Sequence, residues 1–383
     1  MPELPEVESV RRGVHEWTAD TTITGAEVLD PRILGTTSAR RVEPSAVDGF
    51  VSAVTGHRII GAERRGKFMW LSLGQGPEHA GSGSSEPSSG GARASGRPSE
   101  PSPELSLLIH LGMSGQLRVH SADDPVHRHT RAILRLEPAR DGSRSQGAGA
   151  PAPRGSESEG AGVPAPQRSE SEGAGVPAPQ RSGSVEAESA GQNADRSAGQ
   201  SAARELRFVD QRIFGHLGVQ PLIHAHDRLV PASATHIATD PLEPTFEIGL
   251  TLTALAQKRT AIKSALLDQT LISGIGNIYA DEALFRAGVH PMAIPARTRK
   301  SRLAAVLESA ASVMGDALAV GGTSFDSLYV NVNGESGYFD RALLVYGRGG
   351  QECVRCGNEI QRLSVGGRGT HFCPVCQRPP RYR

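Results

Sequence analysis

The sequence predicts an α+β fold in three successive parts: a mostly β first half, a helical second half and a short cysteine-bearing tail. Three observations lead to this prediction. Segments with strand-like hydropathy dominate the first half, the apolar period changes to that of helices from about Pro241, and all four cysteines follow Tyr346. We expect corresponding domains over residues 1–225, 240–345 and 346–383.

The first half is expected to begin with a helix near Glu3–Val14, because apolar residues there share one side: Leu4, Val7, Val10 and Val14. Strand-like segments follow in two pairs, and each pair flanks a stretch that is poor in apolar residues. The first pair is Lys67–Leu73 with Leu105–Leu111, and the second is Ala132–Glu137 with Glu205–Asp210. Each pair therefore predicts a hairpin with an enlarged loop.

The two enlarged loops, residues 74–104 and 141–204, are predicted to be disordered insertions outside the folded core. The first contains no aromatic residue and no Val, Ile, Leu or Met, and the second contains only three Val. The unit SESEGAGVPAPQR occurs twice in tandem, over 156–168 and 169–181. One Val per unit is too little apolar surface to offset the entropy of ordering it, whereas a long surface insertion costs little folding free energy.

The second half is expected to contain three helices, because apolar residues recur with helical spacing over Leu250–Asp268, Tyr279–Ala287 and Arg299–Val320. A tight turn is predicted at Gly274–Asn277, between the first two helices. A glycine-rich turn before a helix exposes backbone N–H groups that suit one phosphate, and Asn277 could cap the helix and donate to that phosphate. A plain turn between helices is an equally good interpretation.

The four cysteines form two CxxC pairs, Cys353 with Cys356 and Cys373 with Cys376, separated by 16 residues. Each pair can supply two thiolates to one tetrahedral Zn(II), and the spacer suits a β-ribbon that returns the chain. Four thiolates leave no open position for water, so we expect one structural zinc ion without a catalytic role. From Arg348 onward seven Arg stand against two acidic residues, which suggests phosphate contact or a solvated basic tail.

The start of the chain carries the groups that amine catalysis needs. Removal of Met1 would leave Pro2 as a terminal secondary amine, which can attack an electrophilic sugar carbon and form an iminium. Its position at a helix start would disfavour the ammonium form and leave more neutral nucleophile. Glu3 lies beside it and could serve as a general acid or base. Pro and Glu are also common at helix starts for structural reasons alone.

Four further residues stand in short motifs but are ambiguous when taken singly. Lys67 follows RRG at a strand start, and Met113 lies in a turn within IHLGMSG. Arg212 and Phe214 belong to FVDQRIFG. A lone Lys on a strand is usually a surface residue, and Met or Phe usually belongs to a core.

Taken together, these motifs resemble the formamidopyrimidine-DNA glycosylase family. MPELPEVE, RRGK, HLGMSG, DQRxFG, GIGNIYADE, GGTSF…GYF…VYGR and the terminal CxxC pairs occur in the order of the family, and they cover nearly all of the chain outside the insertions. The resemblance implies an N-terminal β-sandwich, a helix–two-turns–helix domain and a zinc ribbon. Damaged double-stranded DNA would lie in the cleft between them.

The resemblance also implies a bifunctional base-excision repair enzyme that is both DNA glycosylase and AP lyase. It would flip an oxidised purine, such as 8-oxoguanine or a formamidopyrimidine, out of the duplex, because the glycosidic bond cannot be reached inside the stack. By resemblance Pro2 attacks C1′, Glu3 protonates the sugar, Lys67 assists β-elimination and Arg368 assists δ-elimination. Three residues would fill the hole left by the flipped base: Met113, Arg212 and Phe214. Three more would contact the DNA backbone: His127, Lys258 and Asn277.

Two positions depart from the family pattern. Ile213 stands where some members carry a second Arg, so one phosphate or opposite-strand contact is expected to be missing. The loop Thr323–Gly337 offers no Lys, so contacts to the damaged base are not carried over. Two alternatives stay open. An endonuclease VIII-like enzyme for oxidised pyrimidines would share Pro2, Glu3 and the zinc ribbon, and a non-catalytic DNA-binding relative would require loss of Pro2, Glu3 or Lys67.

The sequence also bears on where the protein acts. The N-terminus, MPELPEVESVRR, is acidic where a signal peptide is basic, and no apolar h-region follows it. No run approaches the roughly 18 apolar residues of a membrane span. We therefore expect an intracellular, cytoplasmic and nucleoid-associated protein without a membrane partner, and we expect it to act as a monomer.

Overall fold

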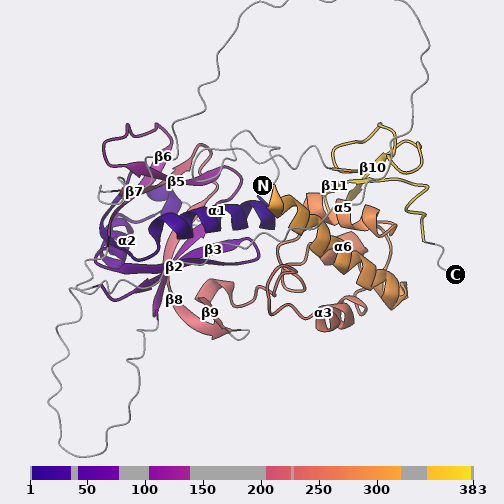
Figure 1. Cartoon of the computed structure of the whole chain (residues 1–383), viewed down its shortest axis with the longest axis horizontal. Coiled ribbons are helices and arrows are strands. Elements are labelled where there is room, and N and C mark those ends of the chain that lie inside the picture. The colour runs from indigo at the N-terminus through magenta and orange to yellow at the C-terminus, as the bar shows by residue number, and fades with distance from the viewer. Residues whose placement is uncertain are drawn as a thin grey trace, which may run out of the picture. The chain divides into compact units, whose positions relative to one another are not determined.

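The computed structural model describes residues 2–35, 42–76, 103–138, 204–225, 228–320 and 343–380. Most of the two predicted insertions and the whole loop Thr323–Gly337 lie outside the described residues. Within them the fold is the predicted α+β arrangement of a β-rich part, a helical part and a cysteine-bearing ribbon (Figure 1). None of the described helices combines the length and the hydropathy needed to cross a bilayer.

The N-terminal part is an antiparallel sheet of nine described strands: β1 (Thr21–Val28), β2 (Arg58–Arg65), β3 (Phe68–Gly74), β4 (Leu105–His110), β5 (Gly115–Ser121), β6 (Thr130–Pro138), β7 (Arg204–Asp210), β8 (His216–Ala225) and β9 (Arg228–Pro231). The strand order is β5-β7-β6-β1-β2-β3-β4-β8-β9, and β1 meets β2 at a single paired position, Thr22 with Arg58. Side chains from both sides of that weak join share one core, for example Phe208 with Ile109. The sheet is thereby folded into the expected β-sandwich.

Both predicted strand pairs are confirmed. β3 and β4 pair antiparallel across the first insertion, with Leu73 opposite Leu105. β6 and β7 pair antiparallel across the second, with Leu136 opposite Arg204. Each insertion therefore leaves and re-enters the sheet at adjacent strands.

The described residues of the first half form two α-helices, although only the opening one is predicted. This is α1 (Leu4–Thr18), and the second is α2 (Pro44–Val54). The signal for α2 is present in the sequence, because Pro44 takes the first helical position and apolar residues recur at helical spacing: Val47, Phe50, Val51 and Val54. Short 3-10 turns cover Pro31–Leu34, Ala232–Ala234 and Pro295–Arg297.

The helical part contains α3 (Ile248–Leu255), α4 (Ile262–Leu266), α5 (Asn277–Arg286) and α6 (Lys300–Ala319). The continuous helix expected over Leu250–Asp268 is wrong, since α3 and α4 are separate. Between them the Lys258 N–H donates to the Leu255 carbonyl, and the Lys258 carbonyl accepts from the Ala296 N–H. This tertiary hydrogen bond fixes a turn where the apolar period alone predicts continuation.

Helix α1 belongs to two hydrophobic cores. Leu4 packs in the core of the helical part, whereas Val7, Val10 and Val14 pack in the core of the sandwich. The first turn of α1 is thus held where the two cores meet. A third, smaller core joins Phe285 of α5 to Ile360 and Cys373. These two residues flank the paired ribbon strands β10 (Gln361–Val365) and β11 (Arg368–Phe372).

Candidate active site

One cavity of about 290 Å³ gathers polar side chains from four separate parts of the chain. Glu3 reaches it from the start of α1, Lys67 from the β2–β3 turn, Asn277 from the start of α5 and Arg368 from the start of β11. The remaining lining residues are Phe68, His110, Leu267, Gln269, Ile275, Gly276, Ile278 and Tyr346. The fold therefore brings four of the predicted site residues together.

The Glu3 carboxylate occupies the N-terminus of α5. Its oxygens accept from the Ile278 N–H at 2.9 Å and the Tyr279 N–H at 3.4 Å, while the Glu3 N–H donates to Glu6 Oε2 at 2.8 Å. Glu3 is only 4% exposed. This burial raises the pKa of Glu3, against the lowering influence of Lys67 and the two N–H groups. A buried carboxyl with a raised pKa at a cavity wall is suited to delivering a proton.

Lys67 is an amine with a lowered pKa in the same cavity. Its Nζ donates to the Ile275 carbonyl at 3.3 Å. Burial lowers the pKa of Lys67, and the nearby Glu3 and Glu6 carboxylates oppose that effect only in part. An amine that gives up its proton more readily than usual can act as a base.

The turn that presents Lys67 is docked onto the helical part. Asp240 accepts from the Gly66 N–H at 3.2 Å and forms a buried ion pair with Arg64. Gly66 has a φ of +55°, and a Cβ there would overlap Ser273. The glycine of RRGK is therefore required both by its backbone conformation and by close approach.

The prediction that Asn277 caps α5 is wrong. Gly276 takes the cap position, and the Glu3 carboxylate accepts the helix N–H groups instead. Asn277 Nδ2 donates to the Gly369 carbonyl at 3.0 Å. This bond holds the start of β11, whose first residue, Arg368, is exposed to the cavity.

Of the predicted catalytic and DNA-binding residues, six lie outside the lining of this cavity, and Pro2 and Lys258 are two of them. Pro2 is buried beside Glu3, and Lys258 pairs with Asp268 at 2.9 Å. His110 also lines the cavity and is not among the predicted site residues, although it belongs to the same motif, IHLGMSG, as Met113. His110 Nδ1 accepts from the backbone N–H of residue 112 at 3.1 Å.

The residues expected to fill the hole left by a base lie on neighbouring loops. Met113 is 37% exposed in the β4–β5 turn, and Arg212 is exposed in the β7–β8 turn, with Phe214 half-buried. Ile213, which replaces an Arg of some family members, is buried in the sandwich core. Its side chain therefore packs in the core and offers no charge to a ligand.

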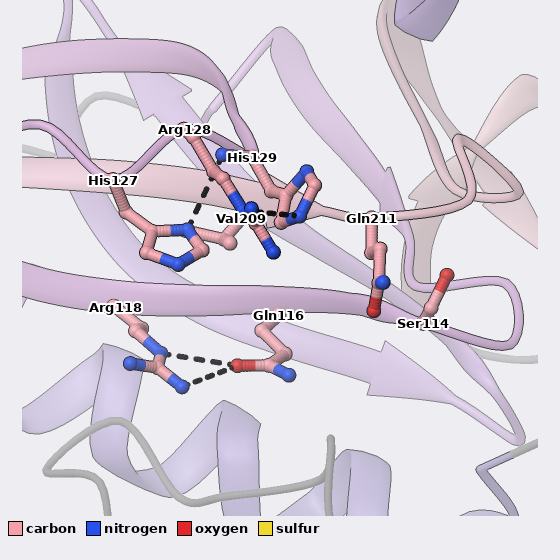
Figure 2. A pocket seen from close by; sticks show the side chains of 8 residues that line it. All are labelled: Ser114, Gln116, Arg118, His127, Arg128, His129, Val209 and Gln211. Carbon is pink, nitrogen blue, oxygen red and sulfur yellow. Dashed lines mark hydrogen bonds between the residues drawn. The ribbon is translucent and has the colours of Figure 1, made fainter.

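His127 lies in a second cavity, of about 270 Å³, between β5, β7 and the turn before β6 (Figure 2). Arg118, Arg128 and His129 line it too, and Gln116 Oε1 accepts from Arg118 at 2.8 Å. His127 Nδ1 accepts from the His129 N–H at 3.2 Å. Basic side chains thus surround this pocket, which is suited to an anionic group.

The four cysteines form the site of one structural zinc ion. Their sulfur atoms all lie within 4.8 Å of one another. Cys356 and Cys373 are 3.5 Å apart, and Cys353 and Cys376 are 3.9 Å apart. Tetrahedral Zn–S bonds of about 2.3 Å require sulfur–sulfur separations of about 3.8 Å, so the donor set fits the metal.

Gly276 is expected to control the position of the Glu3 carboxylate. A Cβ built on Gly276 would overlap that carboxyl, although the φ of −117° at Gly276 suits any residue. Gly276→Ala should therefore fold normally but displace Glu3, and the rate of the reaction catalysed at this cavity should fall about tenfold to 10²-fold. Gly315→Ala is the control, since its Cβ meets nothing within 4 Å. Equal single-turnover rates for the two variants would contradict this role.

His110 is expected to make stability fall in acid. Burial, His216 and Lys67 lower the pKa of His110 from 6.5 to about 4. Between these values the unfolded chain binds the proton and the folded chain does not, so the free energy of unfolding decreases as pH falls. His110→Asn keeps an acceptor for the loop N–H but cannot titrate. Urea unfolding from pH 6.5 to 4 should show a shallower slope for the variant, by up to about 1.4 kcal/mol per pH unit; identical slopes would refute the assignment.

Family models match three successive segments of the chain. They are described as the formamidopyrimidine-DNA glycosylase N-terminal domain, over residues 1–146, the formamidopyrimidine-DNA glycosylase H2TH domain, over 237–328, and the zinc finger found in FPG and IleRS, over 350–379. The order of these segments is that of the sandwich, the helices and the ribbon.

Relatives match over the full length. The formamidopyrimidine-DNA glycosylase of Rhodococcus opacus (strain B4) is 38% identical, over 100% of this chain and 98% of that protein. The protein of the same name from Thermobifida fusca (strain YX) is 40% identical, over 100% and 99%. The crystal structure of Lactococcus lactis Fpg with abasic-site DNA has a TM-score of 0.63 at 24% identity, covering 99% of this chain and 100% of that one, which shows the shared fold.

Proposed function

Because the chain belongs to the formamidopyrimidine-DNA glycosylase family, whose members are DNA glycosylases of base-excision repair, we propose that it excises oxidised purines from damaged double-stranded DNA. The lesions are 8-oxoguanine and formamidopyrimidines, and strand cleavage by β,δ-elimination follows. The observation that supports this most is the meeting of Glu3, Lys67, Asn277 and Arg368 in one cavity beside the start of the chain. The cavity offers an acid, an amine base and a fixed cation around the space for one flipped nucleotide.

The proposed reaction begins at an N-terminus freed of Met1. The Pro2 nitrogen bonds to C1′ and loses its proton to solvent, while Glu3 protonates O4′ as the C1′–O4′ bond breaks. The nitrogen lone pair then expels the base, which leaves with the electrons of the glycosidic bond and takes a proton from solvent. The product is an iminium between Pro2 and C1′. The raised pKa of Glu3 keeps its proton available for this step.

The iminium draws electrons and acidifies C2′, which allows elimination. Lys67 accepts the C2′ proton, the C3′–O3′ bond breaks and the 3′ phosphate leaves. A second elimination then releases the C4′ proton to solvent and breaks the C5′–O5′ bond, and Arg368 stabilises the departing 5′ phosphate. The guanidinium cannot serve as a base, so Arg368 acts through its charge and its donors. Burial, which lowers the pKa of Lys67, favours the neutral amine that the first elimination needs.

Six residues are proposed to hold the DNA around this cavity. Met113, Arg212 and Phe214 replace the flipped base in the stack, and His127, Lys258 and Asn277 contact the backbone. The basic pocket around His127 suits a phosphate. We also propose that the protein acts on nucleoid DNA as a monomer, with domains over residues 1–225, 240–345 and 346–383.

Excision from a panel of single-lesion duplexes tests the substrate class. Lactococcus lactis Fpg, a protein of the same fold, has been crystallised with DNA containing an oxidised pyrimidine, so the panel must include such a lesion. We expect 8-oxoguanine and formamidopyrimidine to be released faster than any oxidised pyrimidine. Faster release of oxidised pyrimidines would favour an endonuclease VIII-like specificity, and binding without release would favour a non-catalytic relative.

A further inference from the structure

The buried carboxylate of Asp210, the last residue of β7, accepts four hydrogen bonds. It has no exposed surface. Its Oδ1 accepts from Ser114 Oγ at 2.5 Å and from the N–H groups of Arg212 and Ile213, both at 3.0 Å. Its Oδ2 accepts from the Gly215 N–H at 2.7 Å. A carboxylate side chain can accept at both oxygens, and these four donors use both of them.

These donors come from two loops, which we name the wedge loops: residues 111–114 between β4 and β5, and residues 211–215 between β7 and β8. They carry Met113, Arg212 and Phe214. The loops also touch directly, since a Cβ on Gly112 would overlap the Phe214 backbone. The carboxylate of Asp210 is therefore a shared anchor for both.

The second wedge loop has a shape that its own residues disfavour. Ile213 is β-branched but has a φ of +55°, in the left-handed region. Such a conformation is unfavourable for a β-branched residue and persists only where the surroundings impose it. Here the surroundings are the bond from the Ile213 N–H to Asp210 and the packing of the side chain in the sandwich core.

We propose that Asp210 is a positioning residue for base flipping. Its carboxylate locks the two wedge loops to each other, so that Met113, Arg212 and Phe214 enter the duplex as one preformed unit. This inference rests on the proposed function, which gives those side chains their role. Inserting a wedge costs free energy because bases must unstack, and a wedge that is already ordered adds no entropy cost of its own at that step. Asp210 does not line the catalytic cavity, so its effect on the reaction passes through insertion.

Two serines make a matched test. Ser114 donates to Asp210, and Ser72 donates to Glu63 at 2.6 Å, on the β2–β3 hairpin. Ser114 is 2% exposed and Ser72 is 1% exposed. Ser114→Ala and Ser72→Ala therefore each remove one hydrogen bond from a buried serine hydroxyl to a carboxylate in the same sandwich, but only the first bond lies between the wedge loops. Asp210→Asn is the stronger variant, because an amide places a donor against one of the four N–H or O–H groups.

The measurement compares two duplexes, with 8-oxoguanine opposite cytosine or opposite an abasic residue. On the first, Ser114→Ala should lower kcat/KM about tenfold, and Asp210→Asn at least as much, with Ser72→Ala within twofold of wild type. On the second, flipping breaks no base pair and leaves no unpaired cytosine for the wedge to stabilise, so both wedge variants should recover to within about threefold of wild type.

Three outcomes would overturn the proposal. They are equal activity of Ser114→Ala and Ser72→Ala on the first duplex, equal losses on both duplexes, and full activity of a folded Asp210→Asn protein. If Asp210→Asn does not fold, the comparison of Ser114→Ala with Ser72→Ala on the two duplexes still tests the proposal. A wild-type enzyme that releases 8-oxoguanine from neither duplex overturns the proposed function itself, and the role of Asp210 falls with it.

Discussion

A chain that keeps Met1, or that carries an uncleaved N-terminal tag, is expected to form no covalent complex with damaged DNA. In such a chain the Pro2 nitrogen is part of a peptide bond, where its lone pair is delocalised and cannot attack C1′. The measurement is borohydride reduction with two duplexes, one with 8-oxoguanine and one with a preformed abasic site. The control is the same tag after cleavage that leaves Pro2 first.

Glu3→Gln is expected to block excision of the base but not the reaction of Pro2 with a preformed abasic site. Gln keeps an oxygen for the Ile278 N–H, so stability should change by no more than about 1 kcal/mol. Base excision should fall by about 10²–10⁴-fold, because the acid that protonates the sugar is lost. The preformed abasic site should still be trapped, since its sugar opens without that proton. A covalent complex between damaged DNA and a chain that keeps Met1 or the tag would contradict the mechanism. Normal base excision by Glu3→Gln would contradict it as well.

Removal of the zinc ion is expected to abolish the contribution of the ribbon to DNA binding. Cys373 is fully buried, and structural zinc supplies about 10–16 kcal/mol of apparent binding free energy to small domains. Cys373→Ser should therefore release the metal and unfold β10 and β11. Arg368 would leave the cavity, so δ-elimination should be lost, and DNA affinity should fall at least tenfold with the basic ribbon.

The hydrogen bonds of the ribbon show which neighbouring helices its unfolding would affect. Lys263 Nζ donates to Thr370 Oγ1 at 2.8 Å, and Asp281 accepts from the His371 N–H at 2.8 Å, so α4 and α5 lose buried partners. Both tryptophans lie in α1 and β3, within the N-terminal part, and their fluorescence should stay native. Val375→Ser, between the second pair of cysteines, is the control. Full zinc content with native DNA affinity in Cys373→Ser would refute the assignment.

Local patterns in the sequence predict helices and strands well where residues close in sequence determine the structure. The β3–β4 and β6–β7 pairs are confirmed because alternating apolar residues specify strands whatever length of chain lies between them. The two cysteine pairs meet because CxxC spacing suits a common metal. The break between α3 and α4 is not local: it depends on Ala296 donating to Lys258, 38 positions earlier in the chain.

The geometry of the candidate site likewise depends on contacts between residues that are distant in the sequence. Motifs name Glu3, Lys67 and Arg368, but no pattern within the first residues indicates that Glu3 takes the N-terminus of a helix that begins at Asn277. That contact decides the burial of the carboxylate and hence the direction of its pKa. Asp210 likewise carries no signal of its own, because its function as an anchor depends on two loops folding against each other.

The central claim is that Pro2 is the nucleophile, and the location of the covalent bond tests it most directly. The native chain, with Met1 removed, is mixed with a duplex containing one 8-oxoguanine, reduced with borohydride and digested with protease and nuclease. Mass spectrometry of the cross-linked peptide should place the reduced sugar on the nitrogen of Pro2, at the start of the sequence PELPEVESVR. A sugar attached to Lys67 or to any other lysine, or no adduct while base is released, would contradict the account.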